Sequence, residues 1–315
     1  MIVLQSGETS AVGRLPFLQK GLLHDLAVAT HGIGVVIEHR YYGSSMPTSD
    51  LSTENLRFLT TDQALADQAY FAKNVVFPGL EHLDLTAPNV AYLAYGGSYA
   101  GAFVAFLRKL YPDIYWGAIS SSGVTAAIWD YWQYYEPIRV YGPARCIEIT
   151  QKIINVVDNI LIGVNDTKTT AVLKGAWGLP NVTNDDDFAS LLSLGVEGWQ
   201  ARNWDPEISA PWFERYCEAI TSDSLAAPVP NSLKSTIRYL LEEGGYKSEI
   251  DYLTTPMLNW INWLTANVVN GCRGNQDKCF GSRNAEFYAQ DDISQDWRSW
   301  PYQVRLILLP SITTN

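Results

Sequence analysis

Four short apolar runs, separated by turns and by segments of mixed polarity, lie in the first 122 residues. They are Ile2 to Gln5, Gly34 to Glu38, Val90 to Tyr95 and Gly117 to Ser121. Continuous apolar runs of this length, bounded by turn residues, are typical of strands buried on both faces of a parallel sheet. The pattern therefore predicts four parallel strands.

Two segments between these runs have the apolar spacing of helices. Thr60 to Val76 repeats small and apolar residues at near-helical intervals, and Thr60 and Thr61 are available to cap its first turn. Tyr99 to Leu110 is apolar on nearly all faces, as expected of a buried helix. The alternation of strand and helix predicts an α/β fold with a mostly parallel sheet.

The character of the chain changes after Gly123, where aromatic residues crowd Trp129 to Tyr135 and helical spacing follows. The helices expected there are Ile147 to Ile162, Ser232 to Glu243 and Met257 to Val269, with Asn184 to Asp187 as one of the acidic connecting loops. A mostly helical segment that follows a core strand is typical of a cap inserted into a hydrolase sheet; the alternative is a separate domain. We expect a core over 1–122 that lacks its first strands, a helical cap over 123–290, and a return toward the core over 291–315.

Composition and charge narrow the class of protein. Of the 315 residues, 47% are hydrophobic and 17% are charged, which indicates a globular chain rather than a disordered one. The 33 acidic and 22 basic residues give a net charge of −11, which would repel nucleic acid and anionic membranes. Leu85 to Leu107 and Tyr252 to Cys272 carry no charge, but Pro, Gly and Asn interrupt them, so no membrane span is expected.

Cysteines and glycosylation motifs both favour an oxidising compartment. The cysteines are Cys146, Cys217, Cys272 and Cys279, and the N-glycosylation triplets begin at Asn165 and Asn181. An even number of cysteines without a Cys-x-x-Cys pair favours disulfides over a metal site, with four buried thiols as the alternative. We expect Cys146 to pair with Cys217, and Cys272 with Cys279 or with a cysteine outside this sequence. No signal peptide follows Met1.

The most informative segment joins an apolar strand to an apolar helix through Gly96-Gly97-Ser98. This is the context of a nucleophile elbow, a strained strand-to-helix turn that lifts a serine hydroxyl above the strand ends. Gly96 and Ala100, two residues to either side of Ser98, are small, as such a turn requires. The sequence therefore predicts Ser98 as a catalytic nucleophile; the alternative is an ordinary tight turn with an N-capping serine.

The same turn predicts an oxyanion site. The backbone N–H of Tyr99 opens the helix and is the expected first donor, because helix N-termini favour negative charge. Gly7, in the small-residue loop after the first strand, is the expected second donor.

No motif for a cofactor or a metal is present, and none is expected. His39 follows a core strand and is interpreted as a hydrogen-bonded structural residue, and the aromatic residues from Trp129 to Tyr135 as cap packing, with a pocket for a proline ring as the alternative.

Three motifs occur in order along the chain. They are Glu38-His-Arg-Tyr-Tyr-Gly-Ser-Ser45, Leu59-Thr-Thr-Asp-Gln-Ala-Leu-Ala-Asp67 and Gly96-Gly-Ser-Tyr-Ala-Gly101, and a fourth similarity lies at Ser299-Trp-Pro-Tyr-Gln303. Together they resemble the prolyl carboxypeptidase and dipeptidyl peptidase II family of serine peptidases, with members of fungal type most similar. The resemblance implies an α/β-hydrolase core with a large helical cap, in a secreted or lysosomal/vacuolar enzyme that cleaves next to proline.

The positions of the histidines conflict with a complete catalytic triad. A triad built on this elbow runs Ser, then Asp or Glu, then His along the chain. All four histidines, His24, His31, His39 and His82, precede Ser98. The alternatives are a non-catalytic homologue and a sequence that stops early. We favour the second, because the residues after Gln303 depart abruptly from the resemblance and form an atypical tail.

The expected function is that of a serine peptidase that forms an acyl-enzyme on Ser98, with peptides or proteins containing proline as substrates. An esterase or lipase on the same fold is one alternative, since fold alone does not define activity. A catalytically dead binding protein is another. The sequence leaves open which end of a peptide is cleaved and how many copies of the chain associate.

Overall fold

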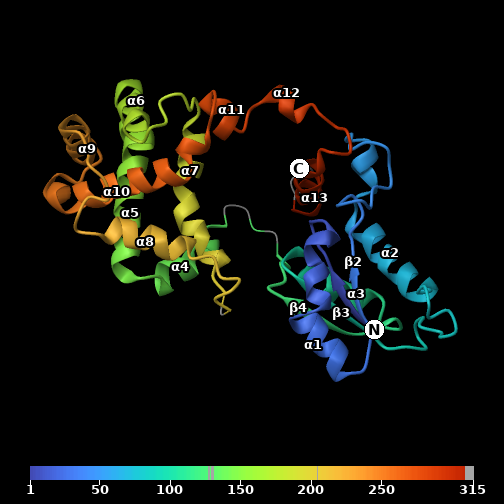
Figure 1. Cartoon of the computed structure of the whole chain (residues 1–315). Helices are drawn as coiled ribbons and strands as arrows, with labels where there is room; N and C mark the ends of the chain where they lie inside the picture. Colours follow the sequence, from blue (N-terminus) through green and yellow to red (C-terminus); the bar gives the residue numbers. More distant parts are fainter. Residues whose placement is uncertain (127, 129–130, 204, 309–315) are drawn as a thin grey trace. The chain divides into compact units, whose positions relative to one another are not determined.

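The computed structural model describes residues 1–126, 128, 131–203 and 205–308, with side chains up to residue 304. The chain divides into two compact units (Figure 1), which we call the sheet unit, Met1–Asp130 with Glu286–Asn315, and the helical unit, Tyr131–Ala285. The helical unit is thus an insertion in the sequence of the sheet unit. Its role as a cap stays a prediction. Trp129 and residues 309–315 of the expected atypical tail lie outside the described residues.

A four-stranded parallel sheet forms the centre of the sheet unit. Its strands are β1 (Ile2–Gln5), β2 (Gly34–Ile37), β3 (Tyr92–Gly97) and β4 (Tyr115–Ser121), in the spatial order β2-β1-β3-β4. In the middle of the sheet, Val3 lies between Val35 and Ala94. All four predicted strands are present, and the expected α/β class is confirmed. The bounds of β1 agree with the sequence pattern, and those of the other strands differ by up to two residues.

The order of the strands reverses at β1. The chain passes from β1 to β2 on one side and later returns to place β3 on the other side. Because the two connections diverge there, a crevice forms outside the carboxyl ends of β1 and β3, which is where open parallel sheets bind ligands. Gly7 follows β1 and Ser98 follows β3, so both predicted residues lie at this switch point.

Helices cover both faces of this sheet. The helices of the sheet unit are α1 (Leu22–Ala29), α2 (Thr61–Asn74), α3 (Tyr99–Leu110) and α13 (Ser299–Leu308), with the short η1 (Ala11–Leu18), η2 (Asn55–Phe58) and η8 (Asp296–Arg298), and α12 (Ala285–Tyr288) begins at the boundary with the helical unit. On one face, α2 and α3 bury Leu65 and Phe103 against Val3. On the other face, Leu23 of α1 packs on Leu4. The predicted cap of α2 is present, since the Thr60 hydroxyl accepts the Gln63 N–H at 3.2 Å.

The described residues of the helical unit contain no strand. Its helices are α4 (Glu136–Tyr141), α5 (Ala144–Asp158), α6 (Thr167–Ala176), α7 (Asp185–Glu197), α8 (Trp212–Thr221), α9 (Asn231–Glu243), α10 (Ile250–Asn267) and α11 (Gln276–Phe280), with the short η3 (Trp132–Tyr134), η4 (Asn159–Val164), η5 (Gly198–Ala201), η6 (Lys247–Glu249) and η7 (Val269–Gly271). Its core is aromatic: the ring of Trp260 lies 5.5 Å from that of Trp177 and 5.3 Å from that of Tyr216. Such edge-to-face pairs add to the free energy gained by burial.

Two disulfides stabilise the helical unit. Cys146 of α5 is bonded to Cys217 of α8, and Cys272 to Cys279. The first pair is the one expected from the sequence, and the second is one of the two pairings that the sequence left open for Cys272. Near the first bond, the Thr150 and Tyr216 hydroxyls are hydrogen-bonded at 2.8 Å. A covalent bond and a buried polar contact therefore join the same two helices.

Two predictions about this unit were wrong in detail. The acidic segment expected to be a loop instead begins α7, with Asp185, Asp186 and Asp187 in its first turn. Acidic side chains stabilise a helix N-terminus, because they interact favourably with the helix dipole. The helix expected from Met257 begins earlier, at Ile250, and contains Pro256. Buried packing along α10 offsets the hydrogen bond that a proline removes.

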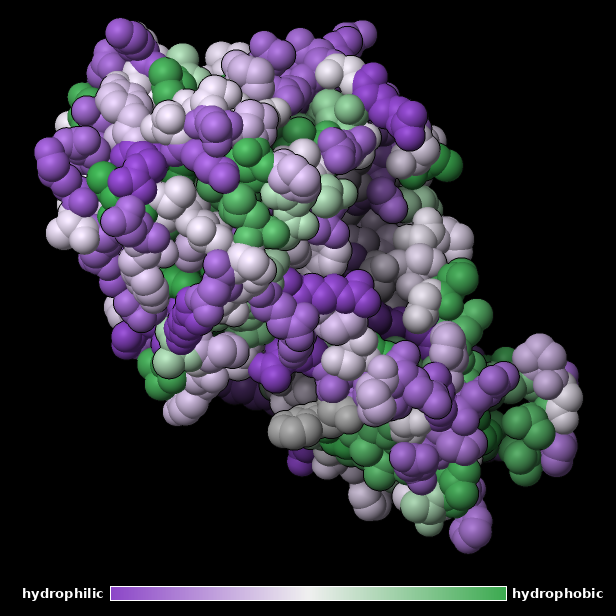
Figure 2. Space-filling model, turned by 60° about the vertical axis from the view of Figure 1, so that its left-hand side comes forward, coloured by the Kyte–Doolittle hydropathy of each residue, from purple (hydrophilic) through white to green (hydrophobic). Residues whose placement is uncertain are grey.

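Among the described residues, no helix is long and apolar enough to cross a membrane. On the face of the molecule that Figure 2 shows, hydrophobic residues form small patches separated by hydrophilic ones. Scattered exposed apolar residues of this kind are normal at protein surfaces.

Candidate active site

Ser98 occupies a strained backbone conformation between β3 and α3. Its φ of 58° and ψ of −125° lie in a region that residues with a side chain rarely adopt. Its N–H donates to the Ser121 carbonyl at 3.0 Å, and its own carbonyl accepts the Gly101 N–H at 3.0 Å. Ser98 itself is exposed. The turn thus presents the serine outward while both of its backbone groups are hydrogen-bonded.

Two glycines make this turn possible. A Cβ atom on Gly96 would lie 2.3 Å from the Ala100 carbonyl oxygen, and one on Gly101 would lie 2.5 Å from that of Ser121. Both distances are far below van der Waals contact, and the atoms met are backbone atoms that cannot rotate away. Glycine is therefore required at Gly96, one of the small residues predicted beside Ser98, and at Gly101, because α3 approaches β3 and the end of β4 closely.

Ser98 opens onto a cavity of about 400 Å³ in the sheet unit. Its lining residues come from the ends of β1, β3 and β4, from η1 and from the start of α1: Leu4, Gln5, Ser6, Glu8, Arg14, Phe17, Gly21, Leu22, Leu23, Tyr95, Gly97, Ser98, Ser121 and Ser122. This volume is in the range of small-ligand sites. The wall combines apolar side chains with a carboxylate, a guanidinium and several hydroxyls.

The two predicted oxyanion donors lie on opposite sides of the switch point. Tyr99 is the first residue of α3, and N–H groups in a first turn have no partner inside the helix. Gly7 has a φ of 73°, and a Cβ built on it would be 3.4 Å from that of Ala100, so the loop after β1 approaches the start of α3. Ser6 and Glu8, which flank Gly7, line the cavity with Ser98.

His39 has the structural role expected of it. It is 3% exposed, its Nδ1 donates to the Arg40 carbonyl at 2.7 Å, and its Nε2 lies 3.0 Å from the Tyr99 hydroxyl. Because a carbonyl only accepts, the proton is on Nδ1, and Nε2 accepts from Tyr99. Burial lowers the pKa of His39 to about 4, so it is neutral over most of the acidic range.

The motifs that begin at Glu38 and Ser299 meet around Tyr99. The Trp300 ring of α13 lies 5.8 Å from the Tyr99 ring, and the Tyr42 hydroxyl donates to Gln303 at 2.8 Å. Burial raises the pKa of Tyr99 to about 12, so its hydroxyl stays protonated. Tyr99, the residue after Ser98, is therefore held by two segments that are far apart in the sequence.

Glu38 joins the loops that follow β1 and β2. Its carboxylate accepts the Ala11 N–H and the Ser44 N–H, each at 2.8 Å, and the Ser45 hydroxyl at 2.8 Å. Burial alone would raise the pKa of Glu38, but these hydrogen bonds outweigh it and the pKa is lowered. The carboxylate acts here as a structural acceptor.

The two predicted N-glycosylation sites lie in the helical unit. Asn165 follows η4 and is exposed, and Asn181 is exposed in the connection before α7. Thr183, the third residue of the second triplet, donates its hydroxyl to Asp277 at 2.6 Å. Within the described part of the chain, no group of three His, Cys, Asp or Glu side chains is arranged to hold a metal ion.

Sequence reasoning did not identify Ser6, Glu8 and Arg14 as lining residues of the Ser98 cavity. For Ser6 and Glu8 a signal existed, because both flank the glycine predicted to donate to an oxyanion. Arg14 gives no such signal, since it lies on η1 and comes near Ser98 only through the fold.

A parallel sheet with a strained serine at its strand-to-helix turn, facing a cavity at the switch point, defines the α/β-hydrolase class. Residues 4–189 match the family model described as serine carboxypeptidase S28. The chain belongs to this family of serine peptidases.

Named relatives agree with this assignment. A "probable extracellular serine carboxypeptidase" of Arthroderma benhamiae is 52% identical over 306 residues, which cover 96% of this chain and 43% of the relative. The "serine protease vicPa" of Bipolaris victoriae is 30% identical over 323 residues, covering 96% of this chain and 56% of the relative. A "lysosomal Pro-X carboxypeptidase" of Homo sapiens is 39% identical over 116 residues, covering 35% of this chain and 21% of the relative. The chain thus spans about half the length of the first two relatives.

Proposed function

We propose that this chain carries the nucleophile and the oxyanion site of a serine peptidase. The single observation behind the proposal is the backbone of Ser98, held at a positive φ in a strand-to-helix turn beside a ligand-sized cavity. In the proposed reaction, the Ser98 hydroxyl oxygen attacks the carbonyl carbon of the substrate and loses its proton to a base. The base then returns this proton to the nitrogen, the C–N bond breaks and the amine departs, which leaves an acyl-enzyme that water hydrolyses.

The backbone N–H groups of Tyr99 and Gly7 would stabilise the negative charge that develops on the carbonyl oxygen. Two features support this role: Tyr99 opens a helix, and the Gly7 loop approaches the same turn. The hydrogen bond of Tyr99 to His39 fixes the side chain of the first donor without using its backbone N–H.

The proposed substrates are peptides that contain proline. The support is family membership together with the human relative, whose name specifies a Pro-X carboxypeptidase. Because no histidine follows Ser98 in these 315 residues, the base and the acid that orients it would come from outside this sequence. With a longer form of the protein that supplies these groups, a panel of prolyl peptides and simple aryl esters would separate a peptidase from an esterase, which would hydrolyse only the esters.

The nucleophile can be tested by covalent capture. In a longer form of the protein that supplies this base, a fluorophosphonate should bond to the Ser98 oxygen with release of fluoride, and peptide mass mapping should find the adduct on this residue alone. Ser98→Ala should abolish capture. Ser121→Ala is the matched control, because it removes a hydroxyl from the same cavity but keeps the backbone carbonyl that the Ser98 N–H needs. An adduct on another serine of folded protein would refute the assignment.

We also propose secretion or delivery to a lysosome-like compartment, with glycans on Asn165 and Asn181. Two disulfides and relatives named extracellular and lysosomal support this location. Protein from a secreting fungal host should lose mass on enzymatic deglycosylation, with the change mapped to these two asparagines. Unmodified asparagines in secreted protein would contradict the glycan assignment.

A further inference from the structure

A second cavity lies within the helical unit and shares no lining residue with the Ser98 cavity. Its volume is about 420 Å³, again in the range of small-ligand sites. The lining residues come from η3 and α4 (Trp132, Tyr135, Glu136, Ile138, Arg139), from α5 (Ile147, Thr150, Gln151, Ile154, Val157, Asp158) and from α7 (Ala189, Leu192, Ser193, Val196). On both α5 and α7 these positions recur at helical spacing, so each helix presents one continuous face to the cavity.

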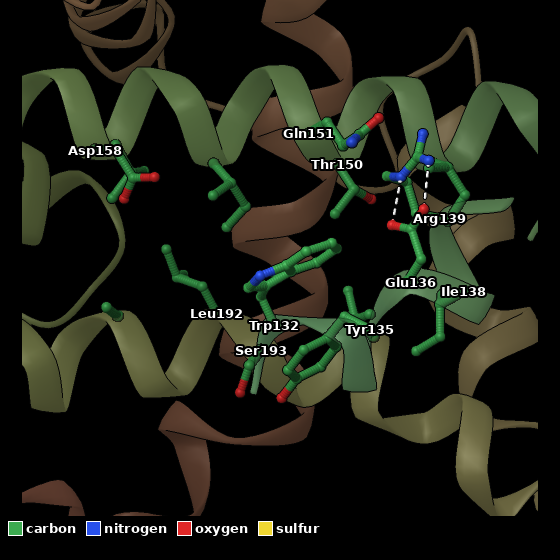
Figure 3. A pocket seen from close by; sticks show the side chains of 15 residues that line it. Trp132, Tyr135, Glu136, Ile138, Arg139, Thr150, Gln151, Asp158, Leu192 and Ser193 are labelled. Atoms are coloured by element: carbon green, nitrogen blue, oxygen red, sulfur yellow. Dashed lines mark hydrogen bonds and ion pairs between the residues drawn. The ribbon is translucent and has the colours of Figure 1, made fainter. Parts of the chain in front are cut away.

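The body of the cavity is apolar and aromatic. Ile147, Val157 and Leu192 form buried parts of its wall. In Figure 3 the indole of Trp132 lies between α5 and the segment that carries Leu192 and Ser193. Trp132 is nevertheless 61% exposed, a high value for a large aromatic residue. An exposed ring beside an apolar wall would gain burial from an apolar ligand.

The charged groups at the two ends of the cavity differ in their hydrogen bonding. At one end, Arg139 and Glu136 are paired through two hydrogen bonds, from Nε at 2.7 Å and from Nη2 at 2.5 Å. At the other end, shown in Figure 3, the side chain of Asp158 is exposed and has no hydrogen bond or ion pair among the described residues. Desolvation by neighbouring atoms raises the pKa of Asp158 although the residue is exposed, because no charged group beside it stabilises the ionised form. A cationic group would supply that stabilisation.

We propose that the cavity between α5 and α7 binds a hydrophobic amine, whose apolar body packs against Trp132 and the aliphatic wall and whose ammonium group pairs with Asp158. Both chemical requirements come from this unit alone, so the site does not depend on Ser98. Two sources carry this chemistry: a small free amine, and the amino terminus of a peptide that begins with an apolar residue.

The probes are three small molecules of similar size and shape: 4-phenylbutylamine, 4-phenylbutanol and 4-phenylbutyrate. Titration calorimetry on the whole chain should give the order of affinity amine, alcohol, carboxylate. We expect the amine to bind about fivefold more tightly than the alcohol, the advantage of one partly exposed ion pair. Equal affinities, or a preference for the carboxylate, would overturn the proposal.

Two variants locate the binding site. Asp158→Asn should reduce amine affinity to that of the alcohol and leave the alcohol unchanged, whereas Glu243→Gln, an equal change of charge at an exposed residue outside the lining, should alter neither. Ala189→Trp places an indole in the cavity from an exposed position of α7 and should abolish binding of all three probes. Ser190→Trp, one residue along the same helix and outside the lining, should not. Thermal unfolding checks that each variant is folded, and amine binding unaffected by Ala189→Trp would refute the site.

The two sources of the amine are separated by a peptide pair. A Phe-Gly amide with a free amino terminus should bind in an Asp158-dependent manner if peptides are the ligand class, and its N-acetyl form should bind more weakly. If 4-phenylbutylamine binds and neither peptide does, the ligand is a small amine. If the acetylated peptide binds as well as the free one, Asp158 does not recognise a cation and the proposal fails.

Discussion

The sheet unit and the helical unit are constrained by different kinds of chemistry. The sheet unit holds all four histidines and no cysteine, and its defining feature is one serine in a strained turn. The helical unit holds all four cysteines, both disulfides and no histidine. One unit therefore depends on backbone positions that few residues can fill, and the other on covalent bonds and an aromatic core. Changes in pH, redox state and sequence should affect the two units separately.

The largest expected effect concerns the catalytic rate of the chain. Neither unit offers Ser98 a base from a later histidine, so this 315-residue chain should not hydrolyse a prolyl substrate at an enzyme's rate. Only the residual acceleration of roughly 10³ to 10⁴ over water, due to binding and oxyanion stabilisation, is expected. The measurement is release of a chromophore from a prolyl anilide by purified protein. Turnover of about 1 s⁻¹ or faster would show that an earlier histidine acts as the base.

Removing the long disulfide should destabilise the helical unit far more than the sheet unit. The Cys146–Cys217 bond spans 71 residues, so replacing both cysteines by serine should cost about 4 kcal/mol in the chain-entropy model. The matched control is the pair Cys272 and Cys279, whose separation of 7 residues gives about 2.5 kcal/mol in the same model. Hydrogen exchange measured peptide by peptide assigns the loss to a unit. Equal losses for both pairs would contradict the loop-length argument.

Mild acid should weaken only the sheet unit. Burial lowers the pKa of His39 to about 4 from an ordinary value of 6.5. Between these pH values the unfolded state binds more protons than the folded state, so stability falls as pH falls from 6.5 toward 4, by roughly 3 kcal/mol in total. The helical unit has no histidine and should lack this dependence. Unfolding measurements on the His39→Gln variant should also show no such dependence of stability on pH. A pH profile like that of the wild type in this variant would show that another group causes the dependence.

A single methyl group tests the backbone constraint around Ser98. Gly96→Ala forces Cβ to within 2.3 Å of the Ala100 carbonyl oxygen and should cost about 2 kcal/mol, with loss of fluorophosphonate capture. Gly97→Ala is the control one residue along β3, where the nearest atom to a Cβ is 3.9 Å away, and it should change stability by less than about 1 kcal/mol. Similar costs for the two variants would show that close approach is not what excludes a side chain at Gly96.

Local patterns predicted the sheet unit well because its elements are specified by neighbouring residues. The bounds of α3 agree with the sequence pattern, and His39 is the buried, hydrogen-bonded residue expected. The apolar run of α1 was not recognised as a helix, since a short run of this kind fits a buried strand equally well. The cavity beside Ser98 was also missed in part, because Arg14 reaches it only through the tertiary fold.

The helical unit was less predictable, because its features depend on contacts between distant elements. The aspartates that begin α7 read as a connecting loop in the sequence, yet they form a helix N-terminus, where acidic residues are favourable. The helix expected from Met257 begins at Ile250, because packing against the core keeps α10 continuous through Pro256. The cavity that contains Trp132 has walls from three segments of the chain, so no single stretch of sequence could indicate it.

The return of α13 to the sheet unit has a consequence for the order of folding. Gln303 contacts Tyr42 across 261 residues, and Ser299 contacts the Tyr41 carbonyl across 258. On a ribosome the whole helical unit is synthesised before these residues exist, and its own contacts are shorter in sequence. Long-range contacts form late, because closing a long loop costs entropy that grows with its length. We expect the helical unit to fold before the surroundings of Tyr99 are assembled, so the residue beside Ser98 would gain its contacts with α13 only after α13 has emerged.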